Sequence, residues 1–327
     1  MKAVVIAEHG APEVLALREI PDPACGPEDL VVRVRATALN RADLLQRRGL
    51  YPQPGPKPEF EVPGLEFAGE VEAMGARTTG FATGDRVMGL LAGGGYAEKI
   101  VVHQRLASSI PDSLTFEQAA AVPEAFITAH DALAQCAFTC GETVLVHAAG
   151  SGVGTAAVQV AKAMGAACVI GTAGSKEKLE AARSLGLDVG IDYKKENFAD
   201  RVLEATGGRG ADVVVDFVGA SWLEGNVRAL AEKGRMVVVG LMGGFSGELP
   251  LGMLMQKRLT IRGTLLRSRS LEEKAAATRA FEKAVLPHLA SGRIRAVVDR
   301  TFALADAADA HRLMEANANF GKIVLTA

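Results

Sequence analysis

No apolar run in this sequence approaches the roughly 18 residues needed to span a membrane. The opening residues, MKAVVIAEHG, hold only a short apolar stretch before Glu8, which is too little for a signal peptide. We therefore expect a cytoplasmic protein with no membrane partner. Charge of one sign is not in excess either, because 36 Lys and Arg residues oppose 38 Asp and Glu residues. This balance argues against nucleic acid as a partner and favours a small molecule.

Cysteine is scarce, with four residues spread over 327 positions. A chain of this size can build a core without disulfides, so reduced thiols are expected. Cys136 and Cys140 could share one face of a helix, but no Cys or His pair nearby completes the four ligands of a structural zinc. We therefore expect no metal.

Residues 1–122 have the pattern of a β-rich domain. Strand-like runs separated by turns rich in Pro and Gly occupy 3–7, 30–39, 69–75 and 96–102. Valine alternates with arginine over 32–35, which is typical of an antiparallel sheet with one face in solvent.

Residues 123–266 have a different rhythm, in which short apolar runs alternate with amphipathic helical patterns. The runs occupy 143–148, 167–172, 189–193, 212–219, 235–241 and 259–266. This alternation is typical of a parallel sheet covered by helices on both faces. We predict an α/β protein whose Rossmann domain, a doubly wound sheet, spans 123–266. Residues 267–327, with a long helix over 272–291, are predicted to return to the first domain.

The segment HAAGSGVGTAA, residues 147–157, directly follows the first of these runs. A glycine-rich turn here is either a cradle for phosphate or a plain tight turn between a strand and a helix. It opens a helix, and a second strand follows within the roughly 30 residues of a dinucleotide-binding βαβ unit. The cradle is the better interpretation, because the N–H groups of residues 151–155 and the positive helix terminus would face a pyrophosphate.

The end of the second run indicates which dinucleotide binds. NAD-binding proteins carry an Asp or Glu about 20 residues beyond the first glycine. Residues 172–176 read Thr-Ala-Gly-Ser-Lys instead. Ser175, Lys178 and Tyr193 could then bind a 2′-phosphate, although lysines on a helix are as often simply solvated. We therefore predict NADPH as the cofactor.

Motifs along nearly the whole chain resemble those of the zinc-independent quinone oxidoreductases of the medium-chain dehydrogenase/reductase superfamily. They include ALNRADLLQRRGLYPQPG at 38–55, GLEFAGEV at 64–71, AAAVPEAFITAHDAL at 119–133, GLMGG at 240–244 and MEANANFGKIVL at 314–325. The resemblance implies a GroES-like catalytic domain built from both ends of the chain, with the Rossmann domain between them. It also implies a homodimer joined through the edge strands of the two Rossmann sheets.

The same motifs imply a set of cofactor contacts, in which Thr128 lies near the nicotinamide and residues 151–154 at the pyrophosphate. The full set is Thr128, Ser151, Gly152, Val153, Gly154, Gly174, Ser175, Lys178, Tyr193, Phe217, Val218, Gly240, Leu241, Met242, Gly243, Leu265, Leu266, Arg267 and Asn319.

Zinc-dependent relatives carry a catalytic Cys and a His in a Gly-His-Glu triplet. Here the triplet reads Gly64-Leu65-Glu66, and residues 40–43 contain no Cys. Metal-assisted alcohol oxidation is therefore not expected, and the hydride acceptor must already be electrophilic. A quinone in the cleft between the domains is the predicted substrate. The alternatives are an enoyl or enone (α,β-unsaturated carbonyl) substrate, or a non-catalytic NADPH-binding protein.

Hydrogen-bond donors that face the acceptor oxygen would stabilise its developing charge. The candidates are Asn40 and Tyr51, with Asp43 positioning one of them. Each has a structural alternative: a turn-forming side chain for Asn40, aromatic packing for Tyr51 and a helix start for Asp43. His147 is expected to be packed and hydrogen-bonded rather than catalytic. Glu66 and Glu124 are expected either to face the cleft or to form a salt bridge.

Overall fold

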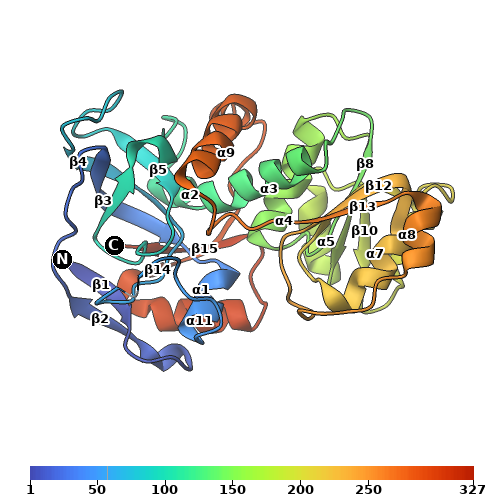
Figure 1. The fold of residues 1–327 in the computed structure, drawn as a ribbon, viewed down its shortest axis with the longest axis horizontal. Helices are drawn as coiled ribbons and strands as arrows, with labels where there is room; N and C mark the ends of the chain where they lie inside the picture. The colour runs from blue at the N-terminus through green and yellow to red at the C-terminus, as the bar shows by residue number, and fades with distance from the viewer. Residues whose placement is uncertain (57) are drawn as a thin grey trace. The chain divides into compact units, whose positions relative to one another are not determined.

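The computed structural model describes residues 1–56 and 58–327. The chain forms two compact units (Figure 1). Unit 1 comprises Met1–Ile127 and Leu266–Ala327, and unit 2 is the continuous stretch Thr128–Leu265 between them. Unit 1 therefore includes residues 123–127 and 266, which the sequence pattern had placed in the Rossmann domain.

Unit 1 is built on a seven-stranded sheet in which most neighbouring strands are antiparallel. Its strands are, in order, β14 (Val298–Ala303), β15 (Lys322–Thr326), β3 (Asp29–Ala38), β4 (Glu66–Met74), β5 (Arg86–Leu90) and β7 (Ala107–Ser109), with β6 (Lys99–His103) paired to β3. A separate two-stranded sheet joins β1 (Lys2–Ile6) to β2 (Leu15–Glu19). The alternation predicted for 32–35 is confirmed, because the two valines are buried and the two arginines are exposed.

Short helices complete unit 1. They are α1 (Arg41–Arg47), α2 (Phe116–Ala120), α9 (Leu271–Ala284), α10 (Leu286–Ala290) and α11 (Ala307–Glu315), with 3-10 turns at Pro12–Val14, Gln104–Leu106 and Leu304–Asp306. The single helix predicted over 272–291 is wrong, because the chain breaks between α9 and α10 at Val285. Pro287 explains the break, since proline has no N–H to donate and its ring clashes with the preceding turn.

Unit 2 contains a six-stranded parallel sheet, as predicted. Its order is β10 (Val189–Asp192), β9 (Cys168–Ala173), β8 (Thr143–Val146), β11 (Ala211–Asp216), β12 (Leu230–Val238) and β13 (Thr260–Gly263). The chain starts at β8, builds outward through β9 and β10, and then crosses back to β11. The strand order reverses between β8 and β11, and open α/β sheets bind ligands at the carboxyl ends of the strands at such a point.

The helices of unit 2 connect these strands (Figure 1). They are α4 (Gly152–Ala163), α5 (Lys176–Arg183), α6 (Phe198–Ala205), α7 (Leu223–Ala229) and α8 (Leu251–Lys257), with a 3-10 turn at Ala220–Trp222. Helix α3 (Pro123–Gln135) begins in unit 1 and continues into unit 2. Serine caps the N-termini of α4 and α5, and Gly165, with φ of 92°, follows the C-terminus of α4.

Each unit has its own buried core. In unit 2 the core takes at least one apolar side chain from each of five neighbouring strands, among them Leu145, Ile170, Ile191, Val214 and Met236. Among the helices of residues 1–56 and 58–327, none combines the length and the apolar character that crossing a bilayer would require.

Candidate functional site

The glycine turn joins β8 to α4 and leaves a helix terminus open. The Ser151 hydroxyl accepts a hydrogen bond from the Gly154 N–H at 3.0 Å and so caps the helix. A Cβ at Gly154 would lie 2.1 Å from the Ala148 carbonyl oxygen, so only glycine fits there. In the described part of the chain, the N–H groups of Gly152 and Val153 have no hydrogen-bond partner. These N–H groups and the positive helix end can therefore receive an anion such as a pyrophosphate.

The residues predicted for the 2′-phosphate gather at the start of α5. The Ser175 hydroxyl accepts the Lys178 N–H at 3.4 Å, so it caps this helix. A Cβ on Gly174 would lie 2.8 Å from the phenol oxygen of Tyr193, whose side chain is 42% exposed. One carboxylate also lies here: Glu177 is exposed, and its hydrogen bonds to its own N–H and to the Ser175 hydroxyl lower its pKa. Glu177 directly follows residues 172–176, the segment that the sequence analysis found to lack a carboxylate.

The loops after β11 and β12 hold each other through backbone hydrogen bonds. The Gly243 N–H donates to the Val218 carbonyl at 2.7 Å, and the Met242 N–H donates to the Phe217 carbonyl at 3.3 Å. The buried Asp216 carboxylate shapes the first of these loops by accepting the Val218 N–H at 2.8 Å. Burial raises the pKa of Asp216 to about 6. Asp216 was not predicted as a site residue, because within an apolar strand it gave no separate signal.

Thr128 carries an orphaned polar atom. Its side chain is 8% exposed, and its Oγ1 has no hydrogen-bond partner in the described residues. A buried hydroxyl without a partner costs about 1–3 kcal/mol, so such atoms are rare unless a ligand completes them. This hydroxyl is compatible with the predicted position of Thr128 near a nicotinamide.

His147 is packed, in agreement with the sequence analysis. Its ring is fully buried, with Nε2 2.6 Å from the Asn226 Oδ1 and Nδ1 3.1 Å from the Thr172 Oγ1. Phe198 and Trp222 also contact the ring edge-to-face. Burial lowers the pKa of His147 to about 4, so the ring is neutral at physiological pH.

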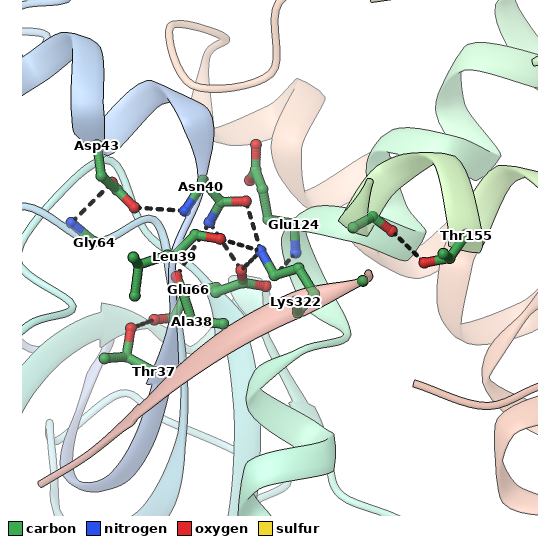
Figure 2. A network of polar contacts seen from close by, with 12 residues as sticks. Thr37, Ala38, Leu39, Asn40, Asp43, Gly64, Glu66, Glu124, Thr155 and Lys322 are labelled. Atoms are coloured by element: carbon green, nitrogen blue, oxygen red, sulfur yellow. Dashed lines mark hydrogen bonds and ion pairs between the residues drawn. The ribbon is translucent and has the colours of Figure 1, made fainter. Parts of the chain in front are cut away.

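In unit 1, a buried polar network surrounds Glu66 (Figure 2). The Lys322 ammonium donates to the Glu66 Oε1 at 2.6 Å, to the Asn40 Oδ1 at 2.7 Å and to the Leu39 carbonyl at 2.8 Å. The Asn40 Nδ2 donates to the same Glu66 oxygen at 2.8 Å, and the Glu124 N–H donates to the other at 2.8 Å. Glu66 thus connects β4, β15 and the starts of α1 and α3. Lys322 was missed by the sequence analysis.

This network bears on the predicted role of Asn40. Its Nδ2 donates to Glu66 and, at 3.3 Å, to the Ala38 carbonyl, while its Oδ1 accepts from Lys322. The side-chain amide therefore already has protein partners for both N–H groups. A role as donor to a substrate oxygen stays a prediction, and the contacts seen suit a positioning role.

Asp43 lies in the same part of unit 1 and is fully buried. It accepts the Asn40 N–H at 2.7 Å, forming a capping box at the start of α1, and the Gly64 N–H at 3.2 Å. The Tyr96 hydroxyl donates to it at 3.1 Å and also lies 3.2 Å from the His311 Nε2. Burial raises the pKa of Asp43 to about 6. Asp43 thus fixes the backbone of Asn40 and of the 62–65 loop.

Tyr51 and Arg267 lie together within unit 1. The guanidinium carbon of Arg267 is 4.9 Å from the centre of the Tyr51 ring. Arg267 also donates to the carbonyls of Ala92 at 2.7 Å and Tyr51 at 3.1 Å, and to the Gln46 Oε1 at 2.7 Å. These contacts give Arg267 a role in holding the Tyr51 loop. The predicted contact between Arg267 and the cofactor stays a prediction. Burial raises the pKa of Tyr51, whose hydroxyl has no partner in the described residues.

The remaining predicted cofactor residues differ in burial. Asn319 is buried and its Nδ2 donates to the Gly321 carbonyl at 2.7 Å. Leu241, Met242 and Leu265 are exposed, whereas Leu266 is buried. In residues 1–56 and 58–327, no three His, Cys, Asp or Glu side chains are grouped so that they could hold a metal ion.

Both units match known protein families. Residues 26–112 match the alcohol dehydrogenase GroES-like domain, and residues 152–283 match the family described as zinc-binding dehydrogenase. Leu65, which stands where the family resemblance would place a zinc-ligand His, is apolar and buried. A GroES-like unit joined to a doubly wound sheet defines the dehydrogenase/reductase class of fold.

Individual similar proteins indicate which family within this class the chain belongs to. A quinone oxidoreductase of Pseudomonas aeruginosa is 39% identical over 330 residues, which cover 99% of each chain. A solved quinone oxidoreductase of Escherichia coli, complexed with NADPH, superimposes with a TM-score of 0.89 at 32% identity. A solved NAD-dependent alcohol dehydrogenase superimposes with a TM-score of 0.90 at 36% identity. Each of these two structural matches covers 100% of this chain and 100% of the solved chain. The chain belongs to the quinone oxidoreductases of the medium-chain dehydrogenase/reductase superfamily.

Proposed function

We propose that this protein is an NADPH-dependent quinone oxidoreductase that works without zinc. The observation that carries the proposal is the open glycine turn at the carboxyl end of β8, with the unpartnered N–H groups of Gly152 and Val153. Quinone reduction is favoured by the full-length similarity to the Pseudomonas aeruginosa enzyme. The same chemistry would reduce an α,β-unsaturated carbonyl, because both acceptors place negative charge on oxygen.

When bound, NADPH supplies a hydride, and the chain supplies binding and orientation. Residues 151–154 would hold the pyrophosphate, Ser175 and Lys178 the 2′-phosphate, and the Thr128 hydroxyl the nicotinamide amide. On the substrate side, the unpartnered Tyr51 hydroxyl is the donor for the acceptor oxygen. The network of Glu66 and Lys322 would fix the backbone on which these groups stand.

The decisive experiment measures NADPH consumption against a panel of quinones and enones, with radical detection in parallel. NADPH binding is followed separately through quenching of Trp222, which is the sole tryptophan of the chain. Quinones are expected to be reduced faster than enones. Tight NADPH binding with no oxidation by any acceptor would instead identify a non-catalytic NADPH-binding protein, and the absence of binding would refute the proposal.

The cofactor preference is a separate part of the proposal. The missing carboxylate at 172–176 supports NADPH, whereas the Glu177 carboxylate at the same helix start opposes a 2′-phosphate. We expect kcat/KM to be higher for NADPH than for NADH, and the ratio to rise further in Glu177→Gln. A ratio below one in the unaltered protein would show that NADH is the cofactor.

We also infer a homodimer formed through the edge of the unit 2 sheet. Among the described strands, β13 has a neighbour on one side only, and Phe245, Leu251 and Met255, which precede it in the chain, are 77%, 62% and 74% exposed. An unpaired edge strand and exposed apolar side chains in the same unit favour association with a second copy. Sedimentation should give twice the 34.2 kDa of one chain. In Phe245→Asp the dimer should weaken, and a monomer in the unaltered protein would refute this.

A cytoplasmic location completes the proposal. The four cysteines are free in the structure, which suits a reducing compartment. Recovery of the native protein from a membrane or secreted fraction would contradict it.

A further inference from the structure

Glu124 differs from the other two carboxyl groups of the unit 1 network. It is the second residue of α3, and its backbone N–H donates to the Glu66 Oε2 at 2.8 Å. Its own carboxyl group accepts no hydrogen bond from residues 1–56 or 58–327, although the residue as a whole is only partly exposed. Asp43 and Glu66, by contrast, each accept three or more hydrogen bonds. The backbone of Glu124 is therefore held in place, while its carboxyl group is not used in a hydrogen bond to the described residues.

The charges around Glu124 favour its protonated form. Lys322 is the one cation hydrogen-bonded to this network in the described residues, and it is already paired with Glu66. Asp43 adds a further acid, so a third carboxylate without donors would be strongly disfavoured. Burial and the nearby Glu66 charge raise the pKa of Glu124 to about 8, and the positive charges of Lys322 and Arg267 only partly oppose this rise. Lys274 of α9 is a further cation within electrostatic reach of Glu124. At neutral pH the group holds a proton that it can give away.

The hydroxyl groups of Thr128 and Tyr51, which have no hydrogen-bond partner in the described residues, are both related to Glu124. Thr128 follows it by four positions along α3, a spacing that places both side chains on one helix face. The Thr128 Oγ1 is buried and has no partner in the described residues, which is a second and independent sign that a ligand completes this helix face. The Tyr51 phenol is within electrostatic reach of Glu124: burial is the main cause of the raised phenol pKa, and the Glu124 charge adds to it.

We propose that Glu124 is the proton donor in the reduction of the substrate. The inference rests on the proposed function, in which a hydride brings two electrons and one hydrogen to a quinone. The quinone then becomes a hydroquinone monoanion. The Glu124 carboxyl O–H bond breaks as a new O–H bond forms on that anionic oxygen, which yields the neutral hydroquinone. The resulting Glu124 carboxylate regains its proton from solvent water.

The first test needs no cofactor and no turnover. Difference infrared spectroscopy of the full chain, titrated from pH 5 to pH 10, should show a protonated carboxyl band that disappears near pH 8. The band should be absent in Glu124→Gln and unchanged in Glu117→Gln. Glu117 is a matched control, because it is the second residue of α2 in the same unit. A Glu124 that is already ionised at pH 6 would overturn the proposal.

The second test measures turnover with a naphthoquinone and NADPH as a function of pH. The unaltered protein should lose activity as the pH rises above about 8, since the acid must be protonated. Glu124→Gln should lower kcat by about 100-fold or more and remove that pH dependence, while NADPH still quenches Trp222 normally. Glu117→Gln should behave as the unaltered protein does.

A third variant covers the case in which Glu124→Gln does not fold. Glu124→Asp keeps an acid at the same place and should retain both the high-pH loss of activity and a titrating carboxyl band. A full rate with no pH dependence in either variant would refute the role of Glu124. If none of the quinones or enones tested supports NADPH oxidation by the unaltered protein, the proposed function fails instead. The infrared titration still reports the protonation of Glu124 in that case.

Discussion

Removing the Lys322 ammonium should destabilise unit 1 far more than removing a surface lysine. The side chains of Lys322 and Glu66 are 4% and 0% exposed, and the ammonium makes three hydrogen bonds of 2.6 to 2.8 Å. In Lys322→Met the Glu66 carboxylate would stay buried, with only the Asn40 amide and the Glu124 N–H as donors. Breaking a buried pair in this way costs about 3–5 kcal/mol.

Urea denaturation measures this cost if two signals are recorded. Far-UV circular dichroism follows both units, whereas the fluorescence of Trp222 follows unit 2. The free energy of unfolding of unit 1 should fall by about 3–5 kcal/mol in Lys322→Met. It should fall by less when Glu66→Gln is added, because the double variant leaves no uncompensated charge in the core.

Lys99→Met is the matched control. Lys99 also pairs with two carboxylates, Asp22 and Glu72, but its side chain is 27% exposed. Its loss should cost far less than that of Lys322, because solvent screens an exposed ion pair. A loss below about 1 kcal/mol for Lys322→Met, or a double variant no more stable than the single one, would refute the reasoning about the buried pair.

Three further predictions concern the other groups of the two units. The pKa of buried Asp43 is raised from 3.8 to about 6, so its contribution to stability is complete below pH 4 and is lost as the pH rises to 6. The stability of the unaltered protein relative to Asp43→Asn, measured by urea denaturation, should therefore fall by about 2–3 kcal/mol between pH 4 and pH 6, and a constant difference would contradict this. Gly154→Ala should abolish NADPH quenching of Trp222, because the new Cβ would lie 2.1 Å from the Ala148 oxygen; unchanged affinity would show that the turn does not hold the pyrophosphate. Tyr51→Phe should lower kcat by about 10-fold or more with little effect on NADPH affinity, and unchanged kinetics would remove the phenol from the mechanism.

Local patterns were sufficient to predict most of the fold. The six strands of unit 2 were recognised because each is a short apolar run, and β13 was predicted as 259–266 where the structure has Thr260–Gly263. Strands β2, β5 and β7 were not recognised, since they are short and are defined mainly by pairing with distant strands. Helix α10 was merged with α9 because a Pro in the first turn of a helix does not interrupt the hydrophobic pattern.

The site was predictable only where its residues form a local motif. The glycine turn is of this kind, and α4 begins there as predicted. The expectation that all N–H groups of residues 151–155 face an anion is wrong, because those of Ser151, Gly154 and Thr155 are hydrogen-bonded within the turn. Lys322 is not, because a lysine at the start of the strand KIVLT looks like an exposed flanking charge. Its burial follows from Glu66, which is 256 residues away in sequence. The unpaired hydroxyls of Thr128 and Tyr51 are likewise a property of tertiary packing alone.

The insertion of unit 2 within unit 1 also sets an order on biosynthesis. Strands β3 and β4 leave the ribosome long before β15, and all of residues 128–265 are made in between. A continuous domain can fold as soon as it has emerged, whereas strands so far apart must first close a very long loop. The nascent chain therefore carries a Glu66 without its cation until translation has passed Lys322. Chaperones that shield the early β-strands would act during this interval.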